Sequence, residues 1–237
     1  SLGSLQLDSV RIDGADGVAV SVELGTSVLD NVDISNAAAV GVLVTGGQMS
    51  FTTGTVHEIR ESDVVPLKAG FAGYGGALNL EDVEVSGVNH GLRLSREALT
   101  TIDNLTVLSP GIDGVSADNA LISGAGLRIE RPANTGLSGV NGAEFQLTDI
   151  EITEPGRIGF LVNGSTFSLS NLSVTDSGER GVSIMNAAGS LSDVNIVNAS
   201  NVGIQITDAS GPTSVGGGRI EGCATSGIAI TGLTHPV

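Results

Sequence analysis

A pattern of apolar residues repeats about every 22 residues along this 237-residue chain, and such self-similarity is typical of repeat architectures. Each copy contains two apolar pairs separated by a one-residue turn, and then a glycine followed by two further apolar positions, as in FQLTDIEITEPGRIGFLV at 145–162 and FSLSNLSVTDSGERGVSI at 167–184. In repeat proteins each unit buries its apolar face against its neighbours. The chain is therefore expected to form a stack of similar units.

The glycine of the pattern marks the units. It recurs with a regular spacing, apart from one wide gap after the second member, at Gly17, Gly41, Gly91, Gly114, Gly136, Gly159, Gly181, Gly203 and Gly227. The wide gap contains one additional, degenerate unit, in which Thr53, Val56, Val65 and Leu67 take the places of the pattern and Val65 replaces the glycine. We therefore expect about ten units of about 22–24 residues, a period within the range of solenoid repeats.

Within a unit, apolar and polar residues alternate in three short runs. In one unit the apolar members are Phe167 and Leu169, then Leu172 and Val174, then Val182 and Ile184. A period of two predicts strands, and no stretch keeps apolar residues at helical spacing. Three strands per unit close a coil, and each strand can pair in parallel with its counterpart about 4.8 Å away in the next coil. The sequence predicts an all-β parallel solenoid.

The single position between the first and second apolar pairs carries asparagine or aspartate in most units: Asn31, Asp82, Asn104, Asp149, Asn171 and Asp193. These residues tolerate a left-handed backbone, which a sharp bend between two strands requires. The coil period and this column resemble the right-handed, single-stranded parallel β-helix of the pectin-lyase-like superfamily, in which asparagines stack at this turn. Stacked aspartates repel one another, so mixing with asparagine or binding of Ca²⁺ is expected to relieve them. No other cofactor is expected.

Composition limits the partners of the chain. It has 26 acidic and 10 basic residues and a net charge of -16, which opposes binding to nucleic acid and to anionic membrane surfaces. A membrane-spanning helix needs about 20 consecutive apolar residues, and no stretch approaches that length, so this segment is not expected to insert into a membrane. Cys223 is the single cysteine, which excludes an internal disulfide and a cysteine-based zinc site. Residues 1–237 are expected to form one domain, excised from a longer protein because the repeats run to both ends.

The resemblance implies that catalytic groups would project outward from the strand that begins at the recurring glycine. The outward positions of that strand are mostly small and neutral, and Lys68, Arg93 and Asp118 are the charged residues expected on successive coils of this face. A polysaccharide lyase needs a base together with acidic groups or Ca²⁺, whereas a glycoside hydrolase needs paired carboxylates. Lys68, Arg93 and Asp118 are therefore the candidate catalytic residues, of a lyase rather than a hydrolase.

Two other groups of residues are candidate sites. His57 is expected beside Asp33 and Glu84, where it forms either a weak metal or acid–base site or an ordinary surface histidine. The segment AGFAGYGG at 69–76 is expected to be an insertion, from which Phe71 and Tyr74 stack on a sugar ring or fold back over the edge of the coil.

Two classes of function fit these features. The favoured hypothesis is a noncatalytic, secreted or cell-surface bacterial module that serves as a stalk, an adhesin-like spacer or a polysaccharide-binding unit. The alternative is a segment of a carbohydrate-active enzyme, either a polysaccharide lyase or a glycoside hydrolase. The expected partner in both cases is a polysaccharide or a cell-surface component. Ice or mineral binding is disfavoured because the outward columns of the second and third strands are too mixed.

Overall fold

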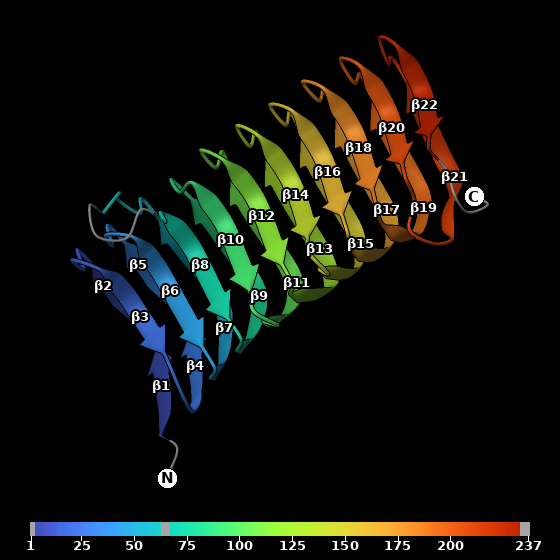
Figure 1. Ribbon diagram of the computed structural model, residues 1–237. Helices are drawn as coiled ribbons and strands as arrows, with labels where there is room; N and C mark the ends of the chain where they lie inside the picture. Colours follow the sequence, from blue (N-terminus) through green and yellow to red (C-terminus); the bar gives the residue numbers. More distant parts are fainter. Residues whose placement is uncertain (1–2, 63–66, 233–237) are drawn as a thin grey trace.

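The computed structural model describes residues 3–62 and 67–232, which form ten coils stacked along one axis (Figure 1). All strand pairs are parallel, and each strand pairs with its counterparts in the adjacent coils. No helix lies in these two ranges, and thus none that is long and apolar enough to cross a membrane. The predicted all-β parallel solenoid of about ten coils is confirmed.

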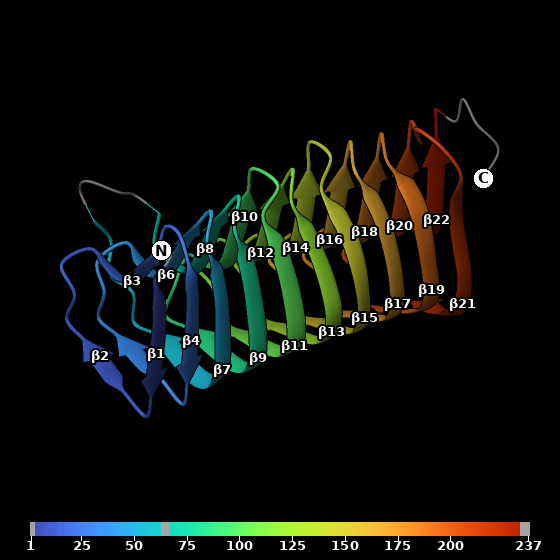
Figure 2. The ribbon, with the colours of Figure 1, turned by 90° about the horizontal axis from the view of Figure 1, so that it is seen from below.

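Two sheets form the walls of the solenoid, and the colours run in order along both of them (Figure 2). The first sheet contains β1 (Ser4–Asp8), β2 (Arg11–Asp13), β4 (Thr26–Asp30), β5 (Asp33–Ser35), β7 (Gln48–His57), β9 (Ala77–Ser86), β11 (Leu99–Leu108), β13 (Leu121–Glu130), β15 (Glu144–Thr153), β17 (Thr166–Thr175), β19 (Ala188–Val197) and β21 (Thr213–Glu221). The second sheet contains β3 (Val18–Val22), β6 (Val40–Thr45), β8 (Ala69–Tyr74), β10 (His90–Ser95), β12 (Asp113–Asp118), β14 (Thr135–Val140), β16 (Ile158–Asn163), β18 (Arg180–Met185), β20 (Val202–Thr207) and β22 (Ser226–Thr231).

The three predicted strands per coil appear separately only in the first two coils. From β7 onward the first and second runs are joined into one longer strand that bends in its middle, for example at Asp149 in β15 and Asn171 in β17. A single left-handed residue is enough to turn the chain, so pairing with the next coil continues on both sides of the bend. The six corner residues predicted from the sequence all have φ between 50° and 63°, which confirms the predicted turn.

The corner side chains also bond from coil to coil. Asn104 Nδ2 donates to Asp82 Oδ1 at 2.6 Å, and Asn171 Nδ2 donates to Asp149 Oδ1 at 2.8 Å. In each pair the asparagine amide donates a hydrogen bond to the aspartate, whereas an ionised carboxylate at the same position would have no proton to donate. Alternation of asparagine with aspartate therefore replaces repulsion along the ladder with a charge-assisted hydrogen bond.

The core consists of apolar columns that run from coil to coil inside the two sheets. Phe145, Phe160 and Phe167 pack edge to face, with ring centroids 5.7 and 5.8 Å apart, and all three are buried. Phe145 and Phe167 are register partners on neighbouring strands, and Phe160 faces them from the second sheet. The same inward positions are apolar in most coils, so the core is continuous through the stack.

The third coil departs from the predicted register. Val65, which was expected to replace the glycine, lies outside the described residues, and Gly70 occupies the glycine position because β8 pairs Phe71 with Val42 on one side and Leu92 on the other. A Cβ on Gly70 would collide with the side chain of Val85 and come within 2.9 Å of the Gly91 carbonyl oxygen. This crowding explains why glycine recurs here. In the first coil Ala19, and not Gly17, lies in register with Gly41.

Replacing Asn171 with aspartate is expected to lower the free energy of unfolding by about 1 kcal/mol, because it removes the donor to Asp149 and stacks three carboxylates in succession, at positions 149, 171 and 193. Urea denaturation at low ionic strength and neutral pH measures the change. Asn195→Asp is the matched control, since the register neighbours of Asn195 are Ser173 and Arg219. Equal destabilisation by the two variants would show that the amide-to-carboxylate bond does not stabilise the ladder.

Candidate functional site

Of the three predicted catalytic residues, Arg93 and Asp118 lie on the expected face and Lys68 does not. Lys68 precedes β8, and its carbonyl oxygen accepts a hydrogen bond from Asn89 N at 2.8 Å, so Lys68 lies before the strand on which Arg93 and its neighbours project. Arg93 is the partner of Ser116, whereas Asp118 is the partner of Ser95. Arg93 and Asp118 thus project from the same outer face on successive coils, in the two neighbouring columns that the sequence predicts. Only the predicted placement of Lys68 is wrong, because Tyr74 and not Lys68 is the partner of Ser95. The cause is the displaced third coil.

The predicted sugar-binding aromatics are also placed differently. The segment at 69–76 is not an insertion, because Ala69–Tyr74 forms β8 itself. Phe71 is fully buried and packs edge-on against Phe51, with ring centroids 5.2 Å apart, so its ring is not at the surface. Tyr74 is half-buried at the end of the strand and packs beside a small apolar cluster outside the main core. The two aromatic rings do not form one platform.

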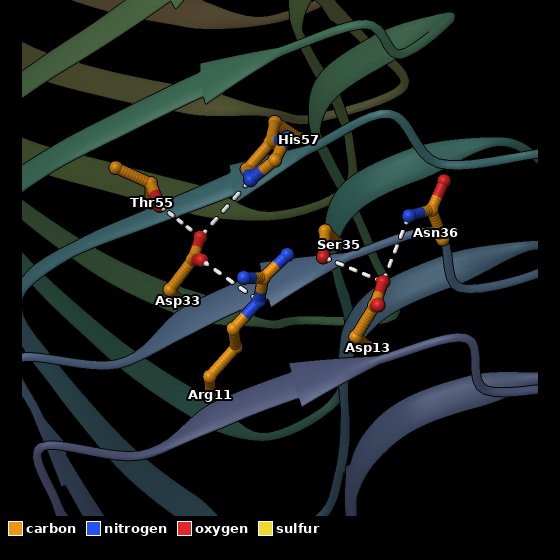
Figure 3. A network of polar contacts seen from close by, with 7 residues as sticks. All are labelled: Arg11, Asp13, Asp33, Ser35, Asn36, Thr55 and His57. Atoms are coloured by element: carbon orange, nitrogen blue, oxygen red, sulfur yellow. Dashed lines mark hydrogen bonds and ion pairs between the residues drawn. The ribbon is translucent and has the colours of Figure 1, made fainter.

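A polar network lies on the outer face of β2, β5 and the second half of β7 (Figure 3). Asp33 Oδ1 accepts a hydrogen bond from Thr55 at 2.6 Å and lies 3.0 Å from His57 Nε2, while Arg11 Nε is 3.6 Å from Asp33 Oδ2. The expected contact between His57 and Asp33 is thus observed, although Thr55, rather than His57, lies in register with Glu84. The carboxylate and the imidazole are thus within hydrogen-bonding distance at the protein surface.

A second carboxylate of this network, that of Asp13 on β2, is also fixed by hydrogen bonds from the next coil. Asp13 Oδ1 accepts from Ser35 Oγ and Asn36 Nδ2, each at 2.8 Å. Hydrogen bonds from Asn36 and Ser35 hold the pKa of Asp13 below its usual value, and the bond from Thr55, followed by the charges of His57 and Arg11, does the same for the pKa of Asp33. Within 3–62 and 67–232 no three His, Cys, Asp or Glu residues converge in a way that would hold a metal ion. Ca²⁺ binding stays a prediction.

His90 is buried at the first residue of β10, in the second sheet, and only 10% of its side chain is exposed. Its Nδ1 atom has no hydrogen-bond partner among the described residues, and Asp113 Oδ2 lies 3.8 Å away. Asp113 Oδ1 is engaged elsewhere, by Asn134 Nδ2 and the backbone N–H of Thr135. Burial lowers the pKa of His90; Asp113 opposes this shift, and Arg93 adds to it. His90 is therefore held neutral inside the fold.

Two shallow grooves lie on the outer face of the first sheet, on the first run of each coil, which is the part of the strand that precedes the corner residue. One has a volume of about 370 Å³ and is lined by outward residues of β4, β7, β9 and β11 and the edges of the inward residues between them: Thr26, Ser27, Val28, Gln48, Met49, Ser50, Ala77, Leu78, Asn79, Leu99 and Thr101. We call it the N-terminal groove. The other, the C-terminal groove, has a volume of about 690 Å³ and lies mainly on β15, β17 and β19, where its outward residues are Glu144, Gln146, Thr148, Thr166, Ser168, Ser170 and Ala188.

The two grooves follow the same columns of the sheet. Val28 is in register with Ser50, Asn79, Thr101, Ser123, Gln146 and Ser168 in turn. The lining is almost entirely uncharged, and its hydroxyl and amide groups recur once per coil. Sequence reasoning considered only the outward positions of the second and third strands and missed this face. The signal was present in the polar residues that alternate with Met49, Leu78 and Phe145.

The profile of the family described as "Right handed beta helix region" matches residues 70–236. The chain belongs to the right-handed β-helix family. This match confirms the predicted handedness, and the whole described part of the chain shares the architecture. No curated protein matches this β-helix in sequence. Among solved structures, the A-module of the mannuronan C-5 epimerase AlgE4 of Azotobacter vinelandii is similar to it, with 12% sequence identity, a TM-score of 0.44, and coverage of 99% of this chain and 88% of that one.

The burial of neutral His90 predicts a pH-dependent stability. The folded-state pKa lies below the unfolded value of 6.5, so the unfolded β-helix binds more protons as the pH falls through this range. The free energy of unfolding should therefore decrease between about pH 7.5 and about pH 5, and His90→Gln should reduce that decrease. Urea titrations at several pH values measure both slopes. Asp13 and Asp33 do not affect this comparison, because a carboxyl group with a lowered folded-state pKa loses its stabilising contribution only below about pH 5. An unchanged slope in His90→Gln would contradict the assignment to His90.

Proposed function

We propose that this β-helix is a noncatalytic module of a secreted or cell-surface protein and that it binds polysaccharide along the outer face of its first sheet. The observation that carries the proposal is the pair of grooves aligned on one set of columns. A polysaccharide is an extended ligand with repeated hydroxyl groups, and this face offers repeated hydroxyl and amide partners along the axis.

The form of the stack supports a binding or spacing role. Backbone pairing is continuous from β1 to β21 in the first sheet and from β3 to β22 in the second. Such a stack holds its surface groups at a fixed spacing without a ligand, so little conformational entropy is lost when an extended ligand binds. The same continuity suits an adhesin-like spacer that carries other parts of a protein.

The alternative is a segment of a carbohydrate-active enzyme. The observation that favours it is the Asp33–His57 contact, since a carboxylate that orients an imidazole is a common acid–base arrangement. The network is open to solvent, with 40% of the Asp33 side chain and 32% of the His57 side chain exposed. Neither groove includes His57 in its lining. The geometry therefore favours binding over catalysis.

The proposal predicts that the protein is retained by polysaccharides that it does not cleave. Affinity electrophoresis through gels that contain single polysaccharides measures retention, and assays for new reducing ends and for unsaturated uronate products measure cleavage. Both are carried out with and without Ca²⁺. Retention without cleavage is the expected result. Cleavage that is lost in His57→Gln would support the enzyme instead, and the absence of both retention and cleavage would leave a spacer as the function.

A further inference from the structure

The N-terminal groove combines exposed apolar groups with amides. Leu99 and Val28 are 54% and 38% exposed, whereas the inward residues Met49 and Leu78 between the lining positions are buried. We infer that this groove is the primary ligand site and that it takes a neutral, linear glycan lying along the helix axis. The inference rests on the proposed polysaccharide binding and adds the position of the site and the charge class of the ligand.

The lining of the groove provides the two kinds of contact that a sugar ring needs. Leu99 and Val28 offer apolar surface to the C–H face of a ring. Gln48 and Asn79 offer amide donors and acceptors to its hydroxyl groups, and Asn79 Nδ2 already donates to Ser50 Oγ at 3.4 Å. Val28 and Leu99 lie on the outer strands of the groove, β4 and β11, and the two amides lie on β7 and β9 between them, so a ligand that crosses all four coils meets both kinds of group.

Charge selects against an acidic polymer. The lining contains no charged residue, but the adjacent outward column carries Asp30, Glu81 and Asp103, all exposed. None of the ten Lys and Arg residues, which are all described, lies at an outward position of a first run in this sheet. A uronate polymer would therefore meet carboxylates without a countercharge. The hydroxyl groups of a neutral glycan can instead donate to these carboxylates in charge-assisted hydrogen bonds.

The spacing of the coils favours a ligand along the axis. Parallel strands lie about 4.8 Å apart, which is close to the length of one sugar residue in an extended chain. Because Ser50, Asn79 and Thr101 are consecutive register partners, each coil presents one hydrogen-bonding group in the same column. A glycan that lay across the axis would meet only one or two coils. The groove spans four strands, which matches a short run of sugars along the axis.

The C-terminal groove lacks this combination. There Gln146 Nε2 donates to Glu144 Oε1 at 2.6 Å, which engages the amide and places a carboxylate in the lining. The other outward residues are small, and no exposed large apolar side chain is among them. The C-terminal groove therefore serves as an internal comparison for the N-terminal groove.

The test measures retention by affinity electrophoresis on a panel of neutral, uronate and chitosan-type polysaccharides. It compares Leu99→Asp, in the groove, with Leu161→Asp, outside it, because the two variants have the same net charge. Leu99→Asp should weaken retention by neutral polymers by about tenfold or more, because it removes the apolar surface and places a carboxylate inside the groove. Asn79→Ala should weaken it by about threefold to tenfold through the lost amide contacts. Leu161→Asp adds the same charge on the outward side of β16, in the other sheet, and should bind as the unmodified protein does. Gln146→Ala changes the C-terminal groove, and it should weaken retention less than Asn79→Ala does.

Each outcome separates the inference from the proposed function. Retention by neutral polymers that is lost in Leu99→Asp and kept in Leu161→Asp supports the inference, provided that thermal unfolding shows both variants to be folded. Retention by neutral polymers that neither Leu99→Asp nor Asn79→Ala weakens overturns the site and leaves the proposed function standing. Retention only by uronate or chitosan polymers overturns the charge class. Retention by no polymer overturns both.

Discussion

Backbone hydrogen bonds between successive coils hold each side chain next to its counterpart about 4.8 Å away, and the other features of this structure depend on that register. Each residue must therefore fit within its own coil and must also pack against the residues at the same position in the coils before and after it. The recurring glycine meets this condition where the next coil's carbonyl approaches, as at Gly70. The corners meet it by pairing an amide with a carboxylate, as between Asn198 and Asp176 or Asn141 and Asp118.

The same register explains how far the fold could be predicted. The period, the alternation and the corner residues are repeated signals, so ten coils and the left-handed corners were predicted correctly. The third coil was misaligned because Leu67 is apolar and buried, but it packs with Ala69 and Ala72 in a small cluster outside the main core. An apolar pattern does not distinguish a residue buried inside the coil from one buried against its outer side. The longer connection between β7 and β8 removed the regular spacing that would have corrected the error.

The site was less predictable for a related reason. Among the three candidate catalytic residues, only the position of Lys68 depended on the register of the irregular third coil, and the structure places Lys68 before β8 and not on the face of Arg93 and Asp118. The contact between His57 and Asp33 survived the same error because a long side chain reaches diagonally across two strands. The grooves depend on the sizes of neighbouring outward side chains and on the curvature of the sheet. No single position in the sequence records either property, although the uncharged columns themselves can be read from it.

Charge is divided between the faces of the first sheet, and this division bears on the proposed binding. On the face of the second runs, carboxylates and arginines pair, as in Arg128 with Glu130 at 2.6 Å and Arg11 with Asp33 at 3.6 Å. These exposed pairs contribute little to stability, but they neutralise part of the surface. On the face of the first runs, Asp30, Glu81 and Asp103 have no basic residue in the same columns. Their acceptor capacity is therefore left for a ligand that brings its own donors, and neutral hydroxyl groups supply donors without a charge that must be desolvated.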